Sequence, residues 1–176
     1  MKLHGYFRSS AAFRVRIALN LKGLNVEHCS HHLRMGEQRS ASYLALNPQG
    51  LVPTLELDSG GMLSQSLAII EWLDETHPLP PLLPPEPWAR ARVRAIALAV
   101  SCDIHPVQNL KVLNRLRGLG LDEAAVVEWA AWANREGPRR ARPCWRRSPV
   151  RSALGRRPHW RTCALCRNSA MRGASW

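Results

Sequence analysis

The stretch that decides the fold is Arg8-Ser9-Ser10-Ala11-Ala12-Phe13-Arg14-Val15-Arg16-Ile17-Ala18-Leu19. Ser9 and Ser10 are good N-cap residues, and Val15, Ala18 and Leu19 follow them at helical spacing. The first N–H groups of a helix are unpaired and carry partial positive charge. Hydroxyls placed there suit an anion, which is a phosphate, a carboxylate or a thiolate. A capped amphipathic helix without any chemistry is the alternative that this stretch alone leaves open.

The residues around this helix predict a small α/β unit. A second helix is expected over residues 67–75, capped by Ser64-Gln65-Ser66 and ending before Pro78. Short apolar or β-branched segments bounded by turn residues predict the strands. The predicted strands are residues 3–7, 25–29 and 51–57, and a return strand that begins at Met62 after a hairpin turn at residues 58–61. The resulting order is β-α-β followed by β-β-α.

A proline-rich segment divides the chain. Residues 78–87 hold six prolines in ten positions, a density that neither a helix nor a central strand accommodates. Beyond it, apolar residues at three- and four-residue steps predict a long amphipathic helix over residues 88–116, bent or interrupted near Pro106. A second helix is expected over residues 122–133. The predicted domains are therefore residues 1–80 and 88–134.

The last quarter of the chain differs in character. Residues 1–134 hold 13 Lys and Arg against 12 Asp and Glu, whereas residues 135–176 hold 12 arginines and one acid. These balances of +1 and +11 give the net charge of +12. Few large aliphatic residues and no period of 2 or 3.6 remain in residues 135–176, so this basic tail is expected to be disordered. One hypothesis for its origin is an out-of-frame continuation of a GC-rich gene, which resequencing would test.

Cysteine and histidine clusters raise the question of a metal. His28, Cys29, His31 and His32 lie close in sequence, but no fourth ligand stands at a standard spacing, which favours solvated loop histidines. Residues 163–166 form a single C-x-x-C, and a zinc site needs paired spacings, so no metal is predicted. Five cysteines without a framework spacing suit a reducing cytosol, and no apolar run is long enough to span a membrane.

Several spaced motifs indicate a family. In order along the chain they are Arg8-Ser9-Ser10, the run from Phe13 to Leu19, Asn47-Pro48, Val52-Pro53-Thr54-Leu55, the run from Gln65 to Glu71, Asp103-Ile104-His105-Pro106 and Asn109-Leu110. From about Leu3 to Leu116 the chain resembles the zeta-class glutathione transferases, the maleylacetoacetate isomerases. The resemblance implies a thioredoxin-like domain followed by an all-α domain, which is incomplete here. This chain has Ala11 where the family has a cysteine, which implies reduced or altered turnover.

The resemblance also implies a glutathione site. It places the catalytic hydroxyl on Ser9, with Ser10 beside it, where both would lower the pKa of the glutathione thiol. Val52-Pro53 resembles the cis X-Pro site of thioredoxin folds, where Val52 would pair with the cysteinyl unit as an added strand. The remaining binding residues implied are Gln65 and Ser66 for the γ-glutamyl carboxylate, Gln38 near the glycyl end, and His105 and Asn109 closing over the tripeptide.

The implied reaction is the cis-to-trans isomerisation of maleylacetoacetate to fumarylacetoacetate, with Arg8 as the leading cation for the carboxylates of a small dicarboxylic substrate. Maleylpyruvate isomerase is a close alternative. A glutathione-binding module without catalysis is an alternative from another class. A third is a nucleic-acid binder acting through the tail, although incidental binding of anions is favoured over specific nucleic-acid recognition. The family implies a cytoplasmic homodimer that does not act at a membrane.

Overall fold

The computed structural model describes the backbone of residues 1–146 and the side chains of residues 1–139. The chain divides into two compact units, Met1–Leu82 and Leu83–Trp176, and the division falls within the proline-rich segment. The predicted C-x-x-C and most of the predicted basic tail lie outside the described residues. None of the helices in the described part of the chain is long and apolar enough to cross a membrane.

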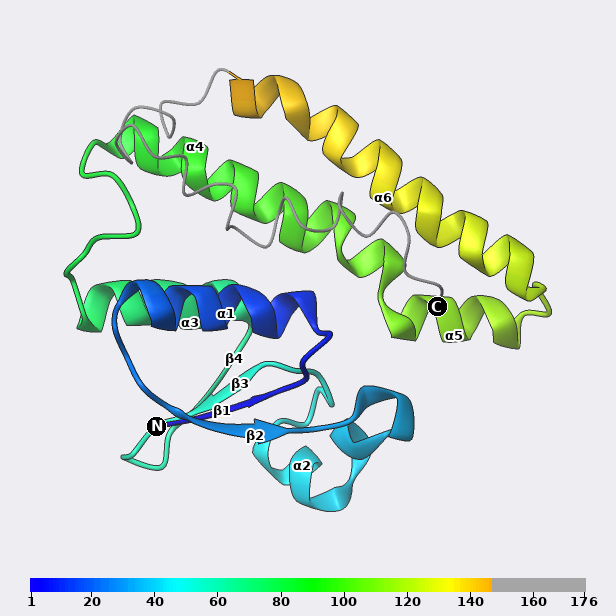
Figure 1. The fold of residues 1–176 in the computed structure, drawn as a ribbon, viewed down its shortest axis with the longest axis horizontal. Coiled ribbons are helices and arrows are strands. Elements are labelled where there is room, and N and C mark those ends of the chain that lie inside the picture. Colours follow the sequence, from blue (N-terminus) through cyan, green and yellow to red (C-terminus); the bar gives the residue numbers. More distant parts are fainter. Residues whose placement is uncertain (147–176) are drawn as a thin grey trace. The chain divides into compact units, whose positions relative to one another are not determined.

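The first unit is built around a four-stranded mixed sheet (Figure 1). The strand order is β2-β1-β3-β4, with β2 parallel to β1 and both other neighbouring pairs antiparallel. The strands are β1 (Lys2–Gly5), β2 (Glu27–Ser30), β3 (Thr54–Glu56) and β4 (Met62–Ser64). The helices are α1 (Ser10–Leu21), η1 (Leu33–Met35), η2 (Glu37–Arg39), α2 (Ala41–Leu46) and α3 (Ser66–Thr76). This is the thioredoxin-like arrangement, and the predicted strands and helices are present with shorter strands.

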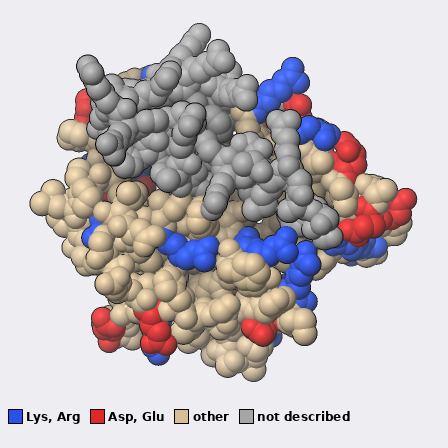
Figure 2. Space-filling model, in the orientation of Figure 1, with Lys and Arg blue, Asp and Glu red and all other residues tan. Residues whose placement is uncertain are grey.

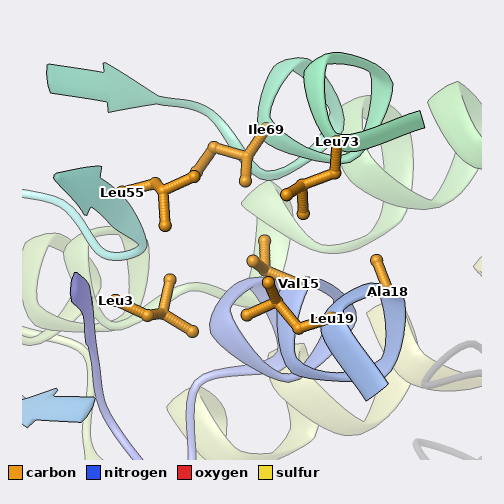
Figure 3. Packing of buried hydrophobic residues seen from close by; sticks show 7 residues of the cluster. All are labelled: Leu3, Val15, Ala18, Leu19, Leu55, Ile69 and Leu73. Atoms are coloured by element: carbon orange, nitrogen blue, oxygen red, sulfur yellow. The ribbon is translucent and has the colours of Figure 1, made fainter. Parts of the chain in front are cut away.

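The apolar core lies between one face of the sheet and the paired helices α1 and α3 (Figure 3). Leu3 of β1 stands directly opposite Leu55 of β3, and both side chains point into this core. Successive side chains of a strand point to opposite faces, so their neighbours His4 and Thr54 occupy the other face, where they meet Tyr43 of α2. The remaining members of the core are Val15, Ala18 and Leu19 of α1 and Ile69 and Leu73 of α3.

A buried lysine joins the ends of α1 and α3. Lys22 is the C-cap of α1, and Gly23 follows with a φ of 66°. The Lys22 side chain is 0% exposed. Its Nζ donates to Asp74 Oδ1 at 2.5 Å and to the carbonyl oxygens of His77 and Pro80, each at 2.7 Å. Lys22 therefore holds the beginning of the proline-rich segment against the first unit.

The second unit contains helices only, within the described residues. The predicted long helix is interrupted earlier than Pro106, because a π-helical segment precedes that proline. The elements are α4 (Pro87–Leu98), the π-helix η3 (Ala99–Ile104), η4 (Pro106–Gln108), α5 (Leu110–Gly118) and α6 (Glu123–Arg146). In Figure 1, α6 runs alongside α4 and the segment that follows it.

Helix α6 corrects one prediction. The prediction of a helix end at Ala133 and of disorder from Arg135 was wrong, because α6 continues to Arg146. The reason is a close approach at Gly137: a Cβ built there would lie 2.5 Å from Ile104 Cγ1. Glycine thus lets this part of α6 lie directly against η3, and Ile104 is only 7% exposed. Arginine and alanine, which are frequent here, also favour helix.

Replacement of Gly137 by alanine tests this packing. The added methyl group would overlap the buried Ile104 side chain, and overpacking of this kind costs about 1–3 kcal/mol. Alanine regains about 1 kcal/mol of helix propensity, so we expect a net loss of stability of up to about 2 kcal/mol. Gly118→Ala, where nothing lies within 4 Å of the added Cβ, is the matched control. Urea unfolding followed by tryptophan fluorescence measures both, and a Gly137→Ala variant as stable as Gly118→Ala would contradict the described packing.

Candidate functional site

The register of the sheet brings four connecting segments to one of its edges. Gly5 at the end of β1 pairs with Ser30 at the end of the parallel strand β2. Thr54, the first residue of β3, pairs with His4 and with Ser64, the last residue of β4. The chain therefore leaves or enters the sheet at the same edge in the segments that carry eight of the predicted site residues. These segments are residues 6–10, 31–40, 51–53 and 65–66.

Ser9 is the N-cap of α1, as predicted. Its backbone is extended, its Oγ accepts a hydrogen bond from the N–H of Ala12 at 3.2 Å, and its own N–H donates to the Tyr6 carbonyl at 2.9 Å. A serine hydroxyl has one hydrogen to donate in addition to its acceptor positions. Because the cap uses an acceptor position, the hydroxyl hydrogen stays available to an anion. Ser10 follows as the first residue of the helix.

Arg16, which was not among the predicted site residues, stabilises the turn before α1. Arg16 Nη2 donates to the carbonyl oxygen of Phe7 at 3.2 Å, and its guanidinium carbon lies 5.3 Å from the centre of the Phe13 ring. The three-residue spacing of Phe13 and Arg16 on one helix face is a signal from which this contact could have been predicted. Arg8 is exposed in the same turn, and its contact with a substrate stays a prediction.

Val52 and Pro53 are joined by a cis peptide bond, which confirms that expectation. Neither the N–H nor the C=O of Val52 hydrogen-bonds to another residue in the described part of the chain. The preceding carbonyl, that of Leu51, accepts from Tyr43 Oη at 2.6 Å and from Asn47 Nδ2 at 2.9 Å. The backbone of Val52 is therefore presented beside a segment that two buried side chains hold in place.

The same two side chains also bind Thr54 on the other side of the cis bond. The Thr54 hydroxyl lies 3.0 Å from Tyr43 Oη and 3.1 Å from Asn47 Nδ2. Burial raises the pKa of the Tyr43 hydroxyl, so it stays protonated and donates. Asn47 was predicted only as part of the Asn47-Pro48 motif, and Tyr43, on the helix that ends just before it, was not among the predicted site residues.

The start of α3 differs from the expected cap. The N-cap residue is Gln65, which has a φ of 69° and makes no side-chain capping hydrogen bond. Its Nε2 instead contacts Gln49 Oε1 at 3.1 Å. Positive φ is unfavourable for a residue with a Cβ, and such positions cluster at ligand sites. The prediction that side chains of Ser64-Gln65-Ser66 cap α3 was therefore wrong, and the absence of a capping side chain leaves the first N–H groups of α3 to a ligand.

Gln38 lies half-buried in η2 at the same sheet edge. Its Nε2 donates to the Leu33 carbonyl at 3.3 Å, whereas its Oε1 is buried without a hydrogen-bond partner among the described residues. A buried acceptor without a donor is unfavourable, and the amide N–H of a peptide ligand would satisfy it.

His105 and Asn109 lie in the second unit. The N–H of His105 donates to the Val100 carbonyl at 2.9 Å, at the junction between η3 and η4. Asn109 is the N-cap of α5, and its Oδ1 accepts from the N–H of Lys111 at 3.3 Å. Both residues thus have local structural roles, and their contact with a ligand stays a prediction.

The histidine cluster is not a set of solvated loop residues. His31 is half-buried and stacks on His4, with ring centres 5.2 Å apart, whereas His28 is exposed. His32 caps η1, accepting at Nδ1 from the N–H of Met35 at 3.3 Å. The described residues contain no group of three or more side chains placed to hold a metal ion.

A shallow hollow on α6 lies apart from these residues in sequence and is lined by Ala125, Glu128, Trp129 and Trp132. None of the predicted site residues lines it. On the face shown in Figure 2, acidic and basic side chains both occur among uncharged ones. The hollow and the predicted site at the sheet edge therefore share no residue.

The sheet edge joins a capped helix N-terminus, a cis-proline segment and an uncapped helix N-terminus in one thioredoxin-like unit. Residues 3–81 match the family model of the glutathione S-transferase N-terminal domain, and this unit belongs to that family.

Relatives extend the likeness into the second unit. Maleylacetoacetate isomerase of Pseudomonas aeruginosa is 53% identical over 131 residues, which cover 73% of this chain and 62% of that protein. Maleylpyruvate isomerase of a Ralstonia species is 50% identical over 131 residues, covering 73% of this chain and 61% of that protein. The chain thus spans about three-fifths of the length of these relatives.

Solved structures agree with this relationship. The holo structure of a maleylpyruvate isomerase, described as a bacterial zeta-class glutathione transferase, superposes with a TM-score of 0.74 at 47% identity, covering 78% of this chain and 65% of that one. Maleylacetoacetate isomerase of Methylobacterium extorquens, with bound malonate and glutathione, gives a TM-score of 0.76 at 46% identity, covering 78% of this chain and 64% of that one. Over this coverage the chain is similar in sequence and fold to a zeta-class glutathione transferase.

Proposed function

We propose that this chain binds glutathione at the sheet edge and uses it to isomerise a cis-enedioic acid, with maleylacetoacetate as the substrate. The observation that carries the proposal is the register His4–Thr54–Ser64, which places the N-termini of α1 and α3 and the cis-proline segment at one edge. Glutathione presents a thiol, a peptide unit and a γ-glutamyl carboxylate, and each of the three features suits one of these groups.

In this proposal, the first unit supplies most of the binding groups. The Ser9 hydroxyl and the α1 N-terminus hold the thiolate, with Ser10 beside them. The unpartnered N–H and C=O of Val52 pair with the cysteinyl unit as an added strand. The uncapped N–H groups at Gln65 and Ser66 bind the γ-glutamyl carboxylate, and Gln38 Oε1 accepts from the amide at the glycyl end. The family resemblance assigns glutathione-binding roles to His105 and Asn109 as well.

The proposed reaction is a reversible addition. The thiolate sulfur forms a bond to one carbon of the cis double bond, and the electron pair of that double bond moves to the conjugated carbonyl as an enolate. The remaining single bond rotates, the enolate re-forms the double bond in the trans geometry, and the sulfur leaves as the thiolate. Glutathione is regenerated, and no proton is gained or lost overall. Arg8 attracts the substrate carboxylates in this scheme.

A glutathione-binding module without catalysis is the second candidate. It rests on the coverage, because the chain spans about three-fifths of its catalytic relatives. Maleylpyruvate as the substrate is a variant of the first candidate, favoured by the likeness to the Ralstonia protein. A homodimer in the cytoplasm completes the proposal and follows from the family resemblance.

Two measurements on the full chain separate the candidates. We expect calorimetry to show binding of reduced glutathione, and the absorbance of maleylacetoacetate to fall only when glutathione is present. Binding without any change in absorbance, with maleylpyruvate tested alongside, would replace the isomerase by the binding module. Absence of binding would overturn both candidates. An analogue that lacks the γ-glutamyl group is the control, and it should bind weakly because it cannot use the start of α3.

A further inference from the structure

A chain of ionisable side chains crosses the face of the sheet opposite the apolar core. His4 is 6% exposed, and its Nδ1 lies 3.0 Å from Nε2 of His31. Its Nε2 lies 3.1 Å from Oε2 of Glu56 on β3. The His31 ring in turn lies against the ring of Tyr43, with centres 4.4 Å apart. Neither histidine nor Glu56 has a role in the proposed isomerisation.

This cluster is connected to two segments of the proposed glutathione site, the one that carries Gln38 and the one that carries Val52. His31 is the first residue after β2, its N–H donates to the Gly5 carbonyl at 2.8 Å, and it begins the segment that carries Gln38. Tyr43 donates to the carbonyl of Leu51, next to Val52. The rings of His4, His31 and Tyr43 contact one another. They are therefore connected both to the Leu51 carbonyl next to Val52 and to the start of the segment that carries Gln38.

The contact between the two histidines limits how many protons the pair can hold. A hydrogen bond between His4 Nδ1 and His31 Nε2 requires one nitrogen to be an acceptor. That condition holds when both rings are neutral, and it holds when either ring has gained one proton. When both rings are cationic, two N–H groups face each other at 3.0 Å, and the contact cannot persist. The second proton must break it.

We propose that His4 and His31 form a proton-sensitive contact that positions the glutathione site, and that acquisition of the second proton releases the segment carrying Gln38 and weakens glutathione binding. The inference rests on the proposed function. In it His4 and His31 are positioning residues, because they act through Tyr43 and the segment of residues 31–40 and not on glutathione directly.

The surrounding charges set the direction of the effect. Burial lowers the pKa of His31 below 6.5, and the charge of His4 lowers it further, whereas Glu37 of η2 opposes this shift. Glu56 from β3 compensates a single positive charge on His4, and Tyr43 from α2 is neutral because burial raises its pKa. The unfolded chain takes up a proton on His31 as the pH falls below about 6.5, whereas the lowered pKa of His31 opposes this uptake in the folded chain. The folded contact is therefore stable above this pH and is lost as the pH falls below it.

The experiment measures binding of S-methylglutathione, which has no thiol to ionise, by calorimetry at about pH 7.5 and about pH 5.5. We expect the dissociation constant of the unmodified chain to rise several-fold at the lower pH, by no more than about tenfold per pH unit for one proton. His31→Gln keeps a donor for His4 Nδ1 but cannot titrate, so the ratio of its two dissociation constants should be close to one. His28→Gln, which removes an exposed histidine of the same strand, should keep the ratio of the unmodified chain.

Two results would overturn the inference while leaving the proposed function intact. One is equal affinity of the unmodified chain at both pH values. The other is a loss of affinity at the lower pH in His31→Gln as large as that in the unmodified chain. Failure of the unmodified chain to bind at about pH 7.5 would overturn the proposed function and the inference with it. Long-range ¹H–¹⁵N spectra of the unmodified chain give a readout that needs no variant. They should show that the His4–His31 pair holds one added proton while the chain is folded, and separate uptake of two protons in the folded chain would contradict the contact.

Discussion

Replacing Ser9 by alanine is expected to lower kcat/KM for glutathione-dependent isomerisation by on the order of a hundredfold, the usual effect of removing one donor to a reacting anion. The Ser9 Oγ accepts from the Ala12 N–H at 3.2 Å, which leaves the hydroxyl hydrogen to the thiolate. Without that donor, the thiol pKa of bound glutathione should rise, and this is measured directly by following thiolate absorbance against pH. The pKa readout applies even if turnover is slow.

The same substitution also removes a helix cap, which costs about 1 kcal/mol. Ser9→Asp separates the two roles because aspartate is a good N-cap residue but brings a negative charge next to the sulfur. We expect Ser9→Asp to unfold in urea like the unmodified chain and to raise the thiol pKa at least as far as Ser9→Ala. Activity of Ser9→Ala within twofold of the unmodified chain, or an unchanged thiol pKa, would refute the role of Ser9.

The largest stability effect is expected at Lys22. Lys22→Met leaves the Asp74 carboxylate with the N–H of Leu82 as its remaining hydrogen-bond donor among the described residues, and it leaves the carbonyls of His77 and Pro80 without their buried donor. Removing one partner of a buried ion pair costs about 3–5 kcal/mol. We therefore expect the free energy of unfolding of the first unit to fall by that amount, measured by urea denaturation.

Lys2→Met is the matched control, because Lys2 is about half exposed and lies 4.0 Å from Glu27. A surface pair of this kind contributes about 0–1 kcal/mol. The double variant Lys22→Met with Asp74→Asn completes a thermodynamic cycle, and it should be more stable than the sum of the two single losses predicts. A Lys22→Met variant that unfolds at the same urea concentration as Lys2→Met would show that the pair does not stabilise the first unit.

Local signals in the sequence predicted most of the first unit. Ser9 before an apolar run at helical spacing predicted the start of α1. Periodicity and turn residues can do this because caps and turns depend on neighbours a few residues away. The cis bond at Val52-Pro53 was expected from the family resemblance, since periodicity and spacing do not report the isomer of an X-Pro bond.

The rest depends on contacts between residues far apart in sequence. Nothing in the local sequence shows that His4 meets His31 and Glu56, because the register of three strands brings them together. The positive φ of Gln65 is likewise imposed by its position between β4 and α3. The extension of α6 beyond Ala133 depends on the fit of Gly137 against Ile104, and the sequence analysis interpreted the same residues as a disordered basic tail.

Strand β3 is three residues long, so a single error in its register would disturb both the apolar core and the proposed site. Sliding β3 by one position along β1 would turn Leu55 to the polar face and push Thr54 or Glu56 among the leucines, since side chains alternate along a strand. The same slip would move the Val52-Pro53 peptide by about 3.3 Å relative to the Ser9 and Ser10 hydroxyls at the start of α1. A misaligned molecule would therefore be unstable and inert at once, so a functional assay of this protein also reports on how faithfully its sheet has assembled.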